Sequence, residues 1–201
     1  MSPSTAADTP DVRDRILTVG QQIMGARGFS AVGLNEILTS AGVPKGSFYY
    51  YFASKEAFGE ALLEDYFEDY LADMDATLRQ PGLTMAGRLA NYWRGWQENQ
   101  SFLDCQGKCL AVKLGAEVSD LSEPMRASLK RGTSKIIEHL ARAIEAGMAE
   151  GSLTCEGAPE DMAQSLYQLW LGTSLMAKIA RSPEPFAQAM KTTKQMLHLP
   201  S

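Results

Sequence analysis

The sequence of 201 residues has only three cysteines and two histidines, and it lacks a long apolar run. No window approaches the roughly 18 to 20 consecutive apolar residues that span a bilayer. The first residues lack the basic and apolar regions of a signal peptide. We therefore expect a cytoplasmic protein without membrane contact. An odd number of cysteines without a secretory signal is not a disulfide framework, so reduced thiols are expected.

The sequence also lacks the motifs of the common enzyme classes. It contains no Gly-x-Ser-x-Gly, no His-Glu-x-x-His, no phosphate-binding glycine loop and no dinucleotide fingerprint. A cysteine-dependent enzyme would need His139 or His198 beside a thiol in space. A zinc site would need Cys105 and Cys109, spaced i, i+4, together with Cys155 and a histidine. Both alternatives are disfavoured, so we expect no enzyme, no metal and no cofactor.

The charges are few and segregated along the chain. The formal net charge of −5 argues against non-specific coating of nucleic acid, because such binding depends on phosphate neutralisation by many lysines and arginines. Residues 42–55 contain two lysines and no acid, whereas residues 56–75 contain eight acids and no base. A local DNA-reading face is compatible with this pattern, and the acidic segment is expected to face away from DNA.

Residues 34–51 have the pattern of a helix-turn-helix. The apolar residues of its first helix recur at helical spacing: Leu34, Ile37, Leu38 and Ala41. Gly42 supplies the turn. Pro44 stands where a second helix, running to about Tyr51, can begin without a backbone N–H.

The second of these helices has two unlike faces. Phe48 and Phe52 share the side that packs inward. The opposite side carries small and phenolic residues, namely Gly46, Ser47, Tyr49 and Tyr50. Small residues allow close approach to DNA, and phenols suit thymine methyls and phosphates. Lys45 and Lys55 add positive charge at both ends. For the tyrosines alone, an aromatic-rich hairpin without DNA contact is the alternative.

The string formed by residues 28–29 and 34–58 resembles the N-terminal DNA-binding domain of the TetR family of transcriptional repressors. The family signature has this order of Gly-Val, Lys-Gly-Ser, Tyr-Tyr-Phe and Ser-Lys-Glu. Together with the outward face of the second helix, this leads us to expect operator contacts by the following residues: Asn35, Lys45, Gly46, Ser47, Tyr49, Tyr50, Tyr51 and Lys55. The family often has Thr or Ser before the first helix, where this chain has Val32-Gly33. A phosphate contact there would come from backbone N–H groups.

The rest of the chain contains helical patterns and no alternating strand, which predicts an all-α fold. Further helices are expected at about 10–27, 55–78, 84–99, 107–118, 122–150, 159–181 and 185–197. The Pro81-Gly82 pair interrupts the pattern. We therefore expect a tail and helix-turn-helix domain at 1–55, a connecting helix at 56–80, and a C-terminal signal-sensing and dimerisation domain at 81–201.

The last two predicted helices carry more apolar residues than one stripe requires. Such a pair suits a four-helix bundle across a two-fold axis, although a larger monomeric core is the alternative. A helix-turn-helix reads palindromic half-sites in pairs. Since the family resemblance also implies a dimer through these helices, we expect a homodimer on palindromic operator DNA.

Cys109 is a candidate sensor thiol. It stands at a predicted helix start, where the helix dipole and Lys108 favour the thiolate; an inert buried cysteine is the alternative. Residues 107–126 and 169–185 also resemble the electrophile-responsive repressors of the TetR family. That resemblance implies that Cys109 matches a sensor cysteine and that Lys178 matches a lysine able to pair with it.

The sequence thus predicts a TetR-type repressor that electrophiles or oxidants release from its operator through Cys109. The alternative is a repressor induced by an apolar small molecule that binds reversibly in the C-terminal domain. The residues expected to line its pocket are Trp93, Trp96, Met125, Trp170 and Met176. The roles of Cys105 and Cys155 stay open.

Overall fold

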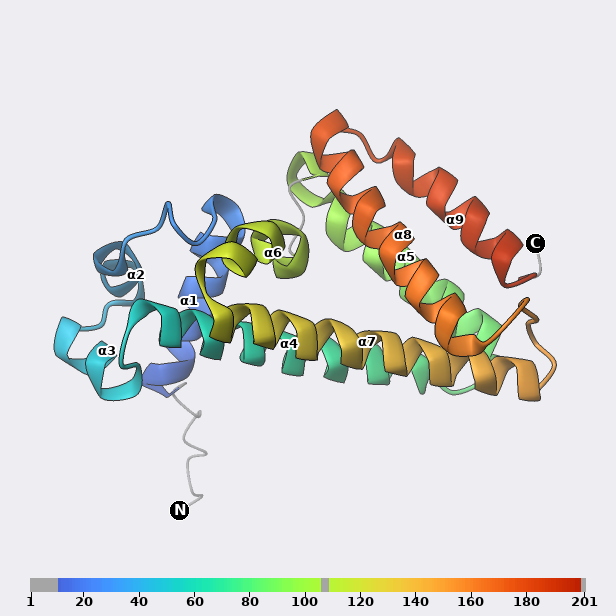
Figure 1. Ribbon diagram of the computed structural model, residues 1–201, viewed down its shortest axis with the longest axis horizontal. Coiled ribbons are helices and arrows are strands. Elements are labelled where there is room, and N and C mark those ends of the chain that lie inside the picture. Colours follow the sequence, from blue (N-terminus) through green and yellow to red (C-terminus); the bar gives the residue numbers. More distant parts are fainter. Residues whose placement is uncertain (1–10, 106–108, 200–201) are drawn as a thin grey trace, which may run out of the picture.

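The computed structural model describes residues 11–105 and 109–199, without the side chains of residues 102–105. These residues form nine α-helices and no strand, which confirms the all-α prediction (Figure 1). None of the described helices combines the length and the apolar content that a membrane crossing requires. The helices are α1 Val12–Arg27, α2 Leu34–Ala41, α3 Lys45–Tyr51, α4 Lys55–Leu78, α5 Met85–Cys105, α6 Leu110–Leu121, α7 Glu123–Ala149, α8 Pro159–Ala180 and α9 Glu184–Met196.

Helices α1, α2 and α3 form the N-terminal unit at one end of the molecule (Figure 1). Helix α2 ends at Gly42, whose φ of 63° lies in the left-handed region that glycine adopts without strain. The backbone N–H of Gly42 donates to the carbonyl oxygens of Leu38 and Thr39. Pro44 is the N-cap of α3. The bounds predicted for the helix-turn-helix are confirmed to within one residue.

Helix α4 extends away from this unit and runs beside α7 (Figure 1). It begins at Ser54, whose hydroxyl accepts a hydrogen bond from the Ala57 backbone N–H at 3.1 Å. The two helices approach closely at Gly132 of α7, where an added Cβ would lie 2.2 Å from the Phe67 ring. This contact fixes α4 firmly against the C-terminal helices.

Helix α6 lies between the N-terminal unit and the helices α5 and α8 (Figure 1). It starts at Leu110, three residues after the predicted start, and it ends at Leu121 rather than 118. The later end has a local reason, because Ser122 is both the C-cap of α6 and the N-cap of α7. The Ser122 hydroxyl accepts a hydrogen bond from the backbone N–H of Met125 at 3.5 Å.

Tryptophans fill the core between α5, α8 and α9. Trp93 and Trp170 are fully buried and stack with ring centroids 4.9 Å apart. The Trp170 indole N–H donates to the Thr193 hydroxyl at 2.8 Å. The Trp96 indole N–H donates to Ser174 at 2.9 Å. Each of these two indole donors thus has a partner, as buried polar groups require.

Candidate DNA-reading surface and sensor cleft

Helix α3 presents the two faces that its sequence predicted. Phe48 and Phe52 are buried, with 0% and 3% exposed. Tyr49 and Tyr50 point outward, with 54% and 83% exposed. An added Cβ at Gly46 would meet no atom within 4 Å, so packing within the chain does not require this glycine. The inward and outward orientations are confirmed, and the surface is open to a partner.

The other polar residues of this surface are accessible. Lys45 and Asn35 are exposed, and Ser47 is half-buried. Gly33 is the N-cap of α2 and offers no side-chain cap. The first backbone N–H groups of α2 therefore lack a capping hydroxyl, and a helix N-terminus of this kind suits a phosphate oxygen.

Tyr51 and Lys55 differ from their neighbours because both are tied to the protein. The Tyr51 hydroxyl donates to the Asp11 carboxylate at 3.4 Å. The Lys55 ammonium donates to the Phe29 carbonyl oxygen at 2.8 Å and lies 4.5 Å from the centre of the Phe29 ring. Contact of these two residues with DNA stays a prediction. The structure adds a second role for Lys55, which joins α4 to the segment after α1.

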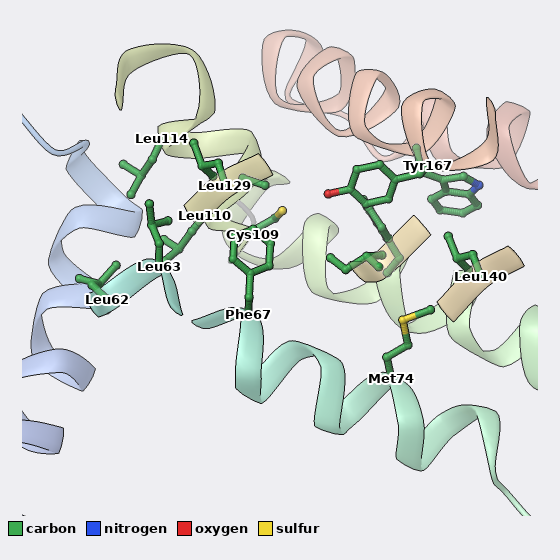
Figure 2. Packing of buried hydrophobic residues seen from close by; sticks show 14 of the residues in the cluster. Leu62, Leu63, Phe67, Met74, Cys109, Leu110, Leu114, Leu129, Leu140 and Tyr167 are labelled. Atoms are coloured by element: carbon green, nitrogen blue, oxygen red, sulfur yellow. The ribbon is translucent and has the colours of Figure 1, made fainter. Parts of the chain in front are cut away.

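Cys109 is the N-cap of α6 and is only 8% exposed. Figure 2 shows it beside Leu110 and Leu129, with its sulfur directed toward Tyr167 of α8. The Tyr66 hydroxyl of α4 lies close enough to the thiol to favour its charged form. The predicted helix-start position is therefore confirmed, and the thiol is enclosed by apolar and phenolic side chains.

The sequence predicted a lowered pKa for the Cys109 thiol, and its burial contradicts this prediction. Burial raises the pKa of Cys109, because an apolar site disfavours the thiolate. The Tyr66 hydroxyl, the first N–H groups of α6 and the ammonium of Lys178 all favour the thiolate, but they do not outweigh burial. Lys108, the other expected cation, lies outside the described residues. The net prediction of a lowered pKa was therefore wrong.

Lys178 nevertheless lies where its charge acts on Cys109. It is half-buried in the last turn of α8. Burial and the neighbouring charge of Lys113 lower the pKa of Lys178, while Cys109 acts in the opposite direction. The pairing expected from the resemblance stays a prediction, and the mutual effect of the two charges is consistent with it. The lowered pKa also increases the share of neutral amine.

A cleft of about 350 Å³ opens between α4 and α5, and Cys109 forms part of its wall. We call it the sensor cleft. Its aromatic walls come from two helices: Tyr66 and Tyr70 of α4, and Tyr92 and Trp96 of α5. Its polar lining residues are Asp69, Asp73, Thr77, Asn91, Asn99 and Gln100, and Met74 and Gly95 complete it.

Four of the five predicted pocket residues do not line the sensor cleft. Trp93 and Trp170 stack on each other in the core and have no exposed surface. Met125 packs against Gly59 at the contact of α4 with α7. Met176 lies on the outside of α8 and is 54% exposed. Of the five, Trp96 lines the cleft, and its role in binding a ligand stays a prediction. The usable signal was the spacing of four between aromatic residues in each of α4 and α5.

Helix α6 contacts the N-terminal unit through one carboxylate that the sequence did not single out. Glu117 accepts hydrogen bonds from the backbone N–H groups of Phe29 at 3.0 Å and Ser30 at 2.7 Å. Within the described ranges these are the only side-chain hydrogen bonds between residues 109–199 and residues 11–54. We call this arrangement the α6 clamp. It connects the helix that begins at Cys109 to the segment between α1 and α2.

The electrostatics of the α6 clamp favour a charged carboxylate. Burial alone would raise the pKa of Glu117, but the hydrogen bonds from Ser30 and Phe29 and the charge of Lys55 together lower it. Lys55 holds the carbonyl oxygen of Phe29, whose N–H is held by Glu117. The peptide groups on both sides of this residue are therefore fixed by two different helices.

The histidines and the remaining cysteines have other surroundings. His139 lies 3.4 Å from the Asp75 carboxylate, and His198 contacts Thr154. Cys109 and Cys155 are free thiols. No group of three metal-binding side chains occurs among the residues that the structure describes. The side chain of Cys105, which the zinc alternative required, lies outside them.

Comparison with known proteins identifies the family. Residues 16–62 match the model of bacterial regulatory proteins of the tetR family. Residues 86–193 match the tetracyclin repressor-like C-terminal domain. The chain belongs to the TetR family. TetR-family repressors bind operator DNA and act as dimers, so the chain is a DNA-binding transcriptional repressor of this type.

Similar TetR-family chains are regulators rather than enzymes. The transcriptional repressor NemR of Escherichia coli K12 is 42% identical over 195 residues, covering 95% of this chain and 96% of NemR. The repressor DhaR of Mycobacterium sp. strain GP1 is 36% identical, covering 97% and 96% of the two chains. A crystal structure of E. coli NemR in its reduced form matches with a TM-score of 0.89 at 43% identity, covering 95% and 99%.

Proposed function

We propose that this repressor leaves its operator when an electrophile or an oxidant modifies the Cys109 thiol. One observation carries the proposal. The thiol lines the sensor cleft and also starts α6, whose Glu117 holds the DNA-binding unit. A reagent that enters the cleft therefore reaches a helix that contacts both domains. The likeness to NemR, which has been crystallised in a form described as reduced, supports a redox-dependent state.

The chemical step at Cys109 can follow two routes. An electrophile such as a quinone adds to the thiolate, which forms a carbon–sulfur bond while the ring carbonyl gains a proton. An oxidant such as a peroxide converts the thiol to a sulfenic acid and is itself reduced to an alcohol or water. The neutral Lys178 amine then attacks the sulfenic sulfur, releasing water and leaving a sulfur–nitrogen bond. Only the second route requires Lys178.

Modification at Cys109 has structural consequences because the thiol is enclosed. An added group on Cys109, which is only 8% exposed, occupies part of the sensor cleft and crowds the side chains packed around the thiol. Packed interiors respond by discrete rearrangement. A displacement of the first turn of α6 is transmitted through the α6 clamp to Phe29 and Ser30. The recognition helices of the dimer would then lose the spacing that a palindromic operator requires.

The DNA contacts in this proposal are made by the exposed surface of α2 and α3. Tyr49, Tyr50 and Ser47 contact base edges and phosphates from α3, with Gly46 allowing close approach. Lys45 neutralises a phosphate. Asn35, Tyr51 and Lys55 are predicted to contact the DNA backbone as well.

The dimer in this proposal forms through α8 and α9. Apolar side chains lie exposed in the last turns of α8: Leu175 at 50%, Met176 at 54% and Ile179 at 67%. An apolar surface of this kind on a long helix suits a symmetric contact with a second copy. Met176 therefore has a place at the interface rather than in a ligand pocket.

The test compares Cys109→Ser with Cys155→Ser as a matched control, because Cys155 lies outside the sensor cleft. Operator affinity is measured by fluorescence anisotropy before and after N-ethylmaleimide or hypochlorite. Wild type and Cys155→Ser should release the operator, and Cys109→Ser should retain it. Lys178→Met should blunt release by hypochlorite more than release by N-ethylmaleimide. Release of the Cys109→Ser protein by both reagents would contradict the proposal.

A second candidate function is induction by a reversibly bound small molecule, and the volume of the sensor cleft favours it. Pockets for small ligands in proteins start at about 300 Å³. Under this alternative Cys109→Ser responds to its inducer as wild type does. Dialysis would restore operator binding to the released protein, whereas a covalent adduct would persist.

A further inference from the structure

The sensor cleft has an unusual charge distribution. Among the residues that the structure describes, the charged ones in its lining are Asp69 and Asp73, and both are acids. Both are exposed, whereas Gln100 and Cys109 in the same lining are buried. Within the described ranges neither carboxylate forms an ion pair. The cleft thus has an anionic, solvent-facing side and an enclosed side that contains the thiol.

The aromatic walls of the cleft meet at steep angles. Trp96 lies edge-on to Tyr70, with an interplanar angle of 82°, and to Tyr92, with an angle of 80°. The hydroxyls of Tyr70 and Tyr92 are hydrogen-bonded at 2.7 Å, which holds α4 and α5 together at this point. Electron-rich rings arranged as walls of a box attract organic cations, and Trp and Tyr are the strongest of the aromatic side chains in this respect.

Neutral ligands fit this lining less well. Carboxylates and phenol hydroxyls lose water when an apolar molecule covers them, and this loss is unfavourable unless a new partner replaces it. An organic cation compensates the carboxylates and contacts the rings at the same time. The cation whose field reaches the thiol, Lys178, comes from α8 and is absent from the lining. It therefore does not occupy the anionic side of the cleft.

We propose that the sensor cleft binds organic cations and that Cys109 is consequently modified faster by positively charged electrophiles than by neutral or negative ones. The part that concerns modification rests on the proposed role of Cys109, whereas cation binding does not. A cation in the cleft also stabilises the thiolate of a thiol that burial otherwise keeps neutral. The ligand then promotes its own reaction by its charge.

The test uses two methanethiosulfonates of similar size, one carrying a trimethylammonioethyl group and the other a sulfonatoethyl group. In each case the Cys109 thiolate attacks the sulfenyl sulfur, a disulfide forms and methanesulfinate leaves. The thiol proton goes to the buffer. Modification of Cys109 and Cys155 is followed by mass spectrometry in the full-length Cys105→Ser protein. Cys155 lies outside the cleft and serves as the internal reference for the effect of overall charge.

At each cysteine we compare the rate of modification by the cationic reagent with the rate by the anionic reagent. We expect this cation-to-anion rate ratio to be at least about tenfold higher at Cys109 than at Cys155. One pKa unit of thiolate stabilisation alone gives about this factor. The double substitution Asp69→Asn and Asp73→Asn should reduce the ratio at Cys109 to near that at Cys155. Glu68→Gln with Glu138→Gln is the matched control, since it removes two exposed acids that do not line the cleft. It should leave the ratio at Cys109 high.

Equal ratios at the two cysteines, or a high ratio that persists in the Asp69 and Asp73 variant, would overturn the cation proposal. The labelled protein is also tested for operator binding, which separates the two proposals. Fast cationic labelling with the operator still bound would refute sensing by Cys109 and leave the cation site intact. Operator release after labelling that shows no charge preference would refute the cation site and leave sensing by Cys109 intact.

Discussion

Glu117→Gln should weaken the α6 clamp between helix α6 and the DNA-binding unit without unfolding either of them. The amide keeps one acceptor oxygen, so one of the two hydrogen bonds from Phe29 and Ser30 is lost and the other no longer involves a charge. The side chain keeps nearly the same size. The change therefore removes an interaction without creating a cavity.

The size of the effect follows from these two bonds. A hydrogen bond to a charged group contributes about 1.5–3 kcal/mol, and the partial exposure of Glu117 places it at the low end of this range. Loss of one bond and of the charge on the other should remove about 1–2 kcal/mol of coupling. Since 1.4 kcal/mol is a factor of ten, the loss of operator affinity on alkylation should shrink by roughly 5- to 30-fold.

The assay measures operator Kd for alkylated and unmodified protein, in wild type and in Glu117→Gln. Glu123→Gln at the start of α7 is the control, because this exposed carboxylate pairs with Arg126 and does not contact the DNA-binding unit. An equal ratio of the two Kd values in Glu117→Gln and in wild type would refute transmission through the α6 clamp.

The ratio of operator Kd values for alkylated and unmodified protein should change with pH only where Glu117 titrates. Because the pKa of Glu117 is lowered in the folded protein, the α6 clamp is fully formed above the ordinary carboxyl pKa of about 4.3 and is lost only as the pH falls through the lowered value. The wild-type ratio should therefore be constant between pH 6 and 8 once alkylation is complete. A decline within that window would contradict this assignment of the link.

Four further predictions concern other parts of the molecule. Since burial raises the pKa of Cys109, its rate of alkylation by N-ethylmaleimide should rise about tenfold per pH unit from pH 7 to 9 without a plateau; a plateau below pH 8.5 would show an activated thiol. Gly132→Ala should destabilise the protein by about 1–3 kcal/mol in urea unfolding, because the new Cβ would overlap the Phe67 ring; unchanged stability would refute this packing. Tyr50→Ala should abolish discrimination between operator and random DNA, whereas Ile179→Glu should yield a folded monomer by sedimentation that binds one half-site weakly.

Much of the fold follows from local patterns in the sequence. The helix-turn-helix was located to within a residue because Gly42 and Pro44 act through their own backbone geometry. Helix α4 was predicted with both ends correct, since Ser54 caps one end and the aromatic spacing continues to the other. The start of helix α6 was predicted three residues too early, because its N-cap Cys109 makes no side-chain capping hydrogen bond that would mark the start in the sequence.

The candidate site was less predictable because its properties arise from distant parts of the chain. The expected lowering of the Cys109 pKa considered the nearby positive charges and the helix start, whereas burial by distant parts of the chain decides the sign. Trp93 and Trp170, which were predicted for a pocket, fill the core, because large apolar side chains alone do not distinguish the wall of a pocket from the protein interior. Glu117 gave no local signal, since its partners are backbone groups 87 and 88 residues away.

Glu117 and Lys55 recognise the main chain of residues 29 and 30 rather than any side chain in that segment. The proposed link between Cys109 and DNA binding is therefore independent of most side chains in the DNA-binding unit. Those side chains are free to diverge toward new operators while the connection persists. A chimera in which α1–α3 come from another repressor should remain inducible, provided that the backbone path after α1 and the residues Glu117 and Lys55 are kept.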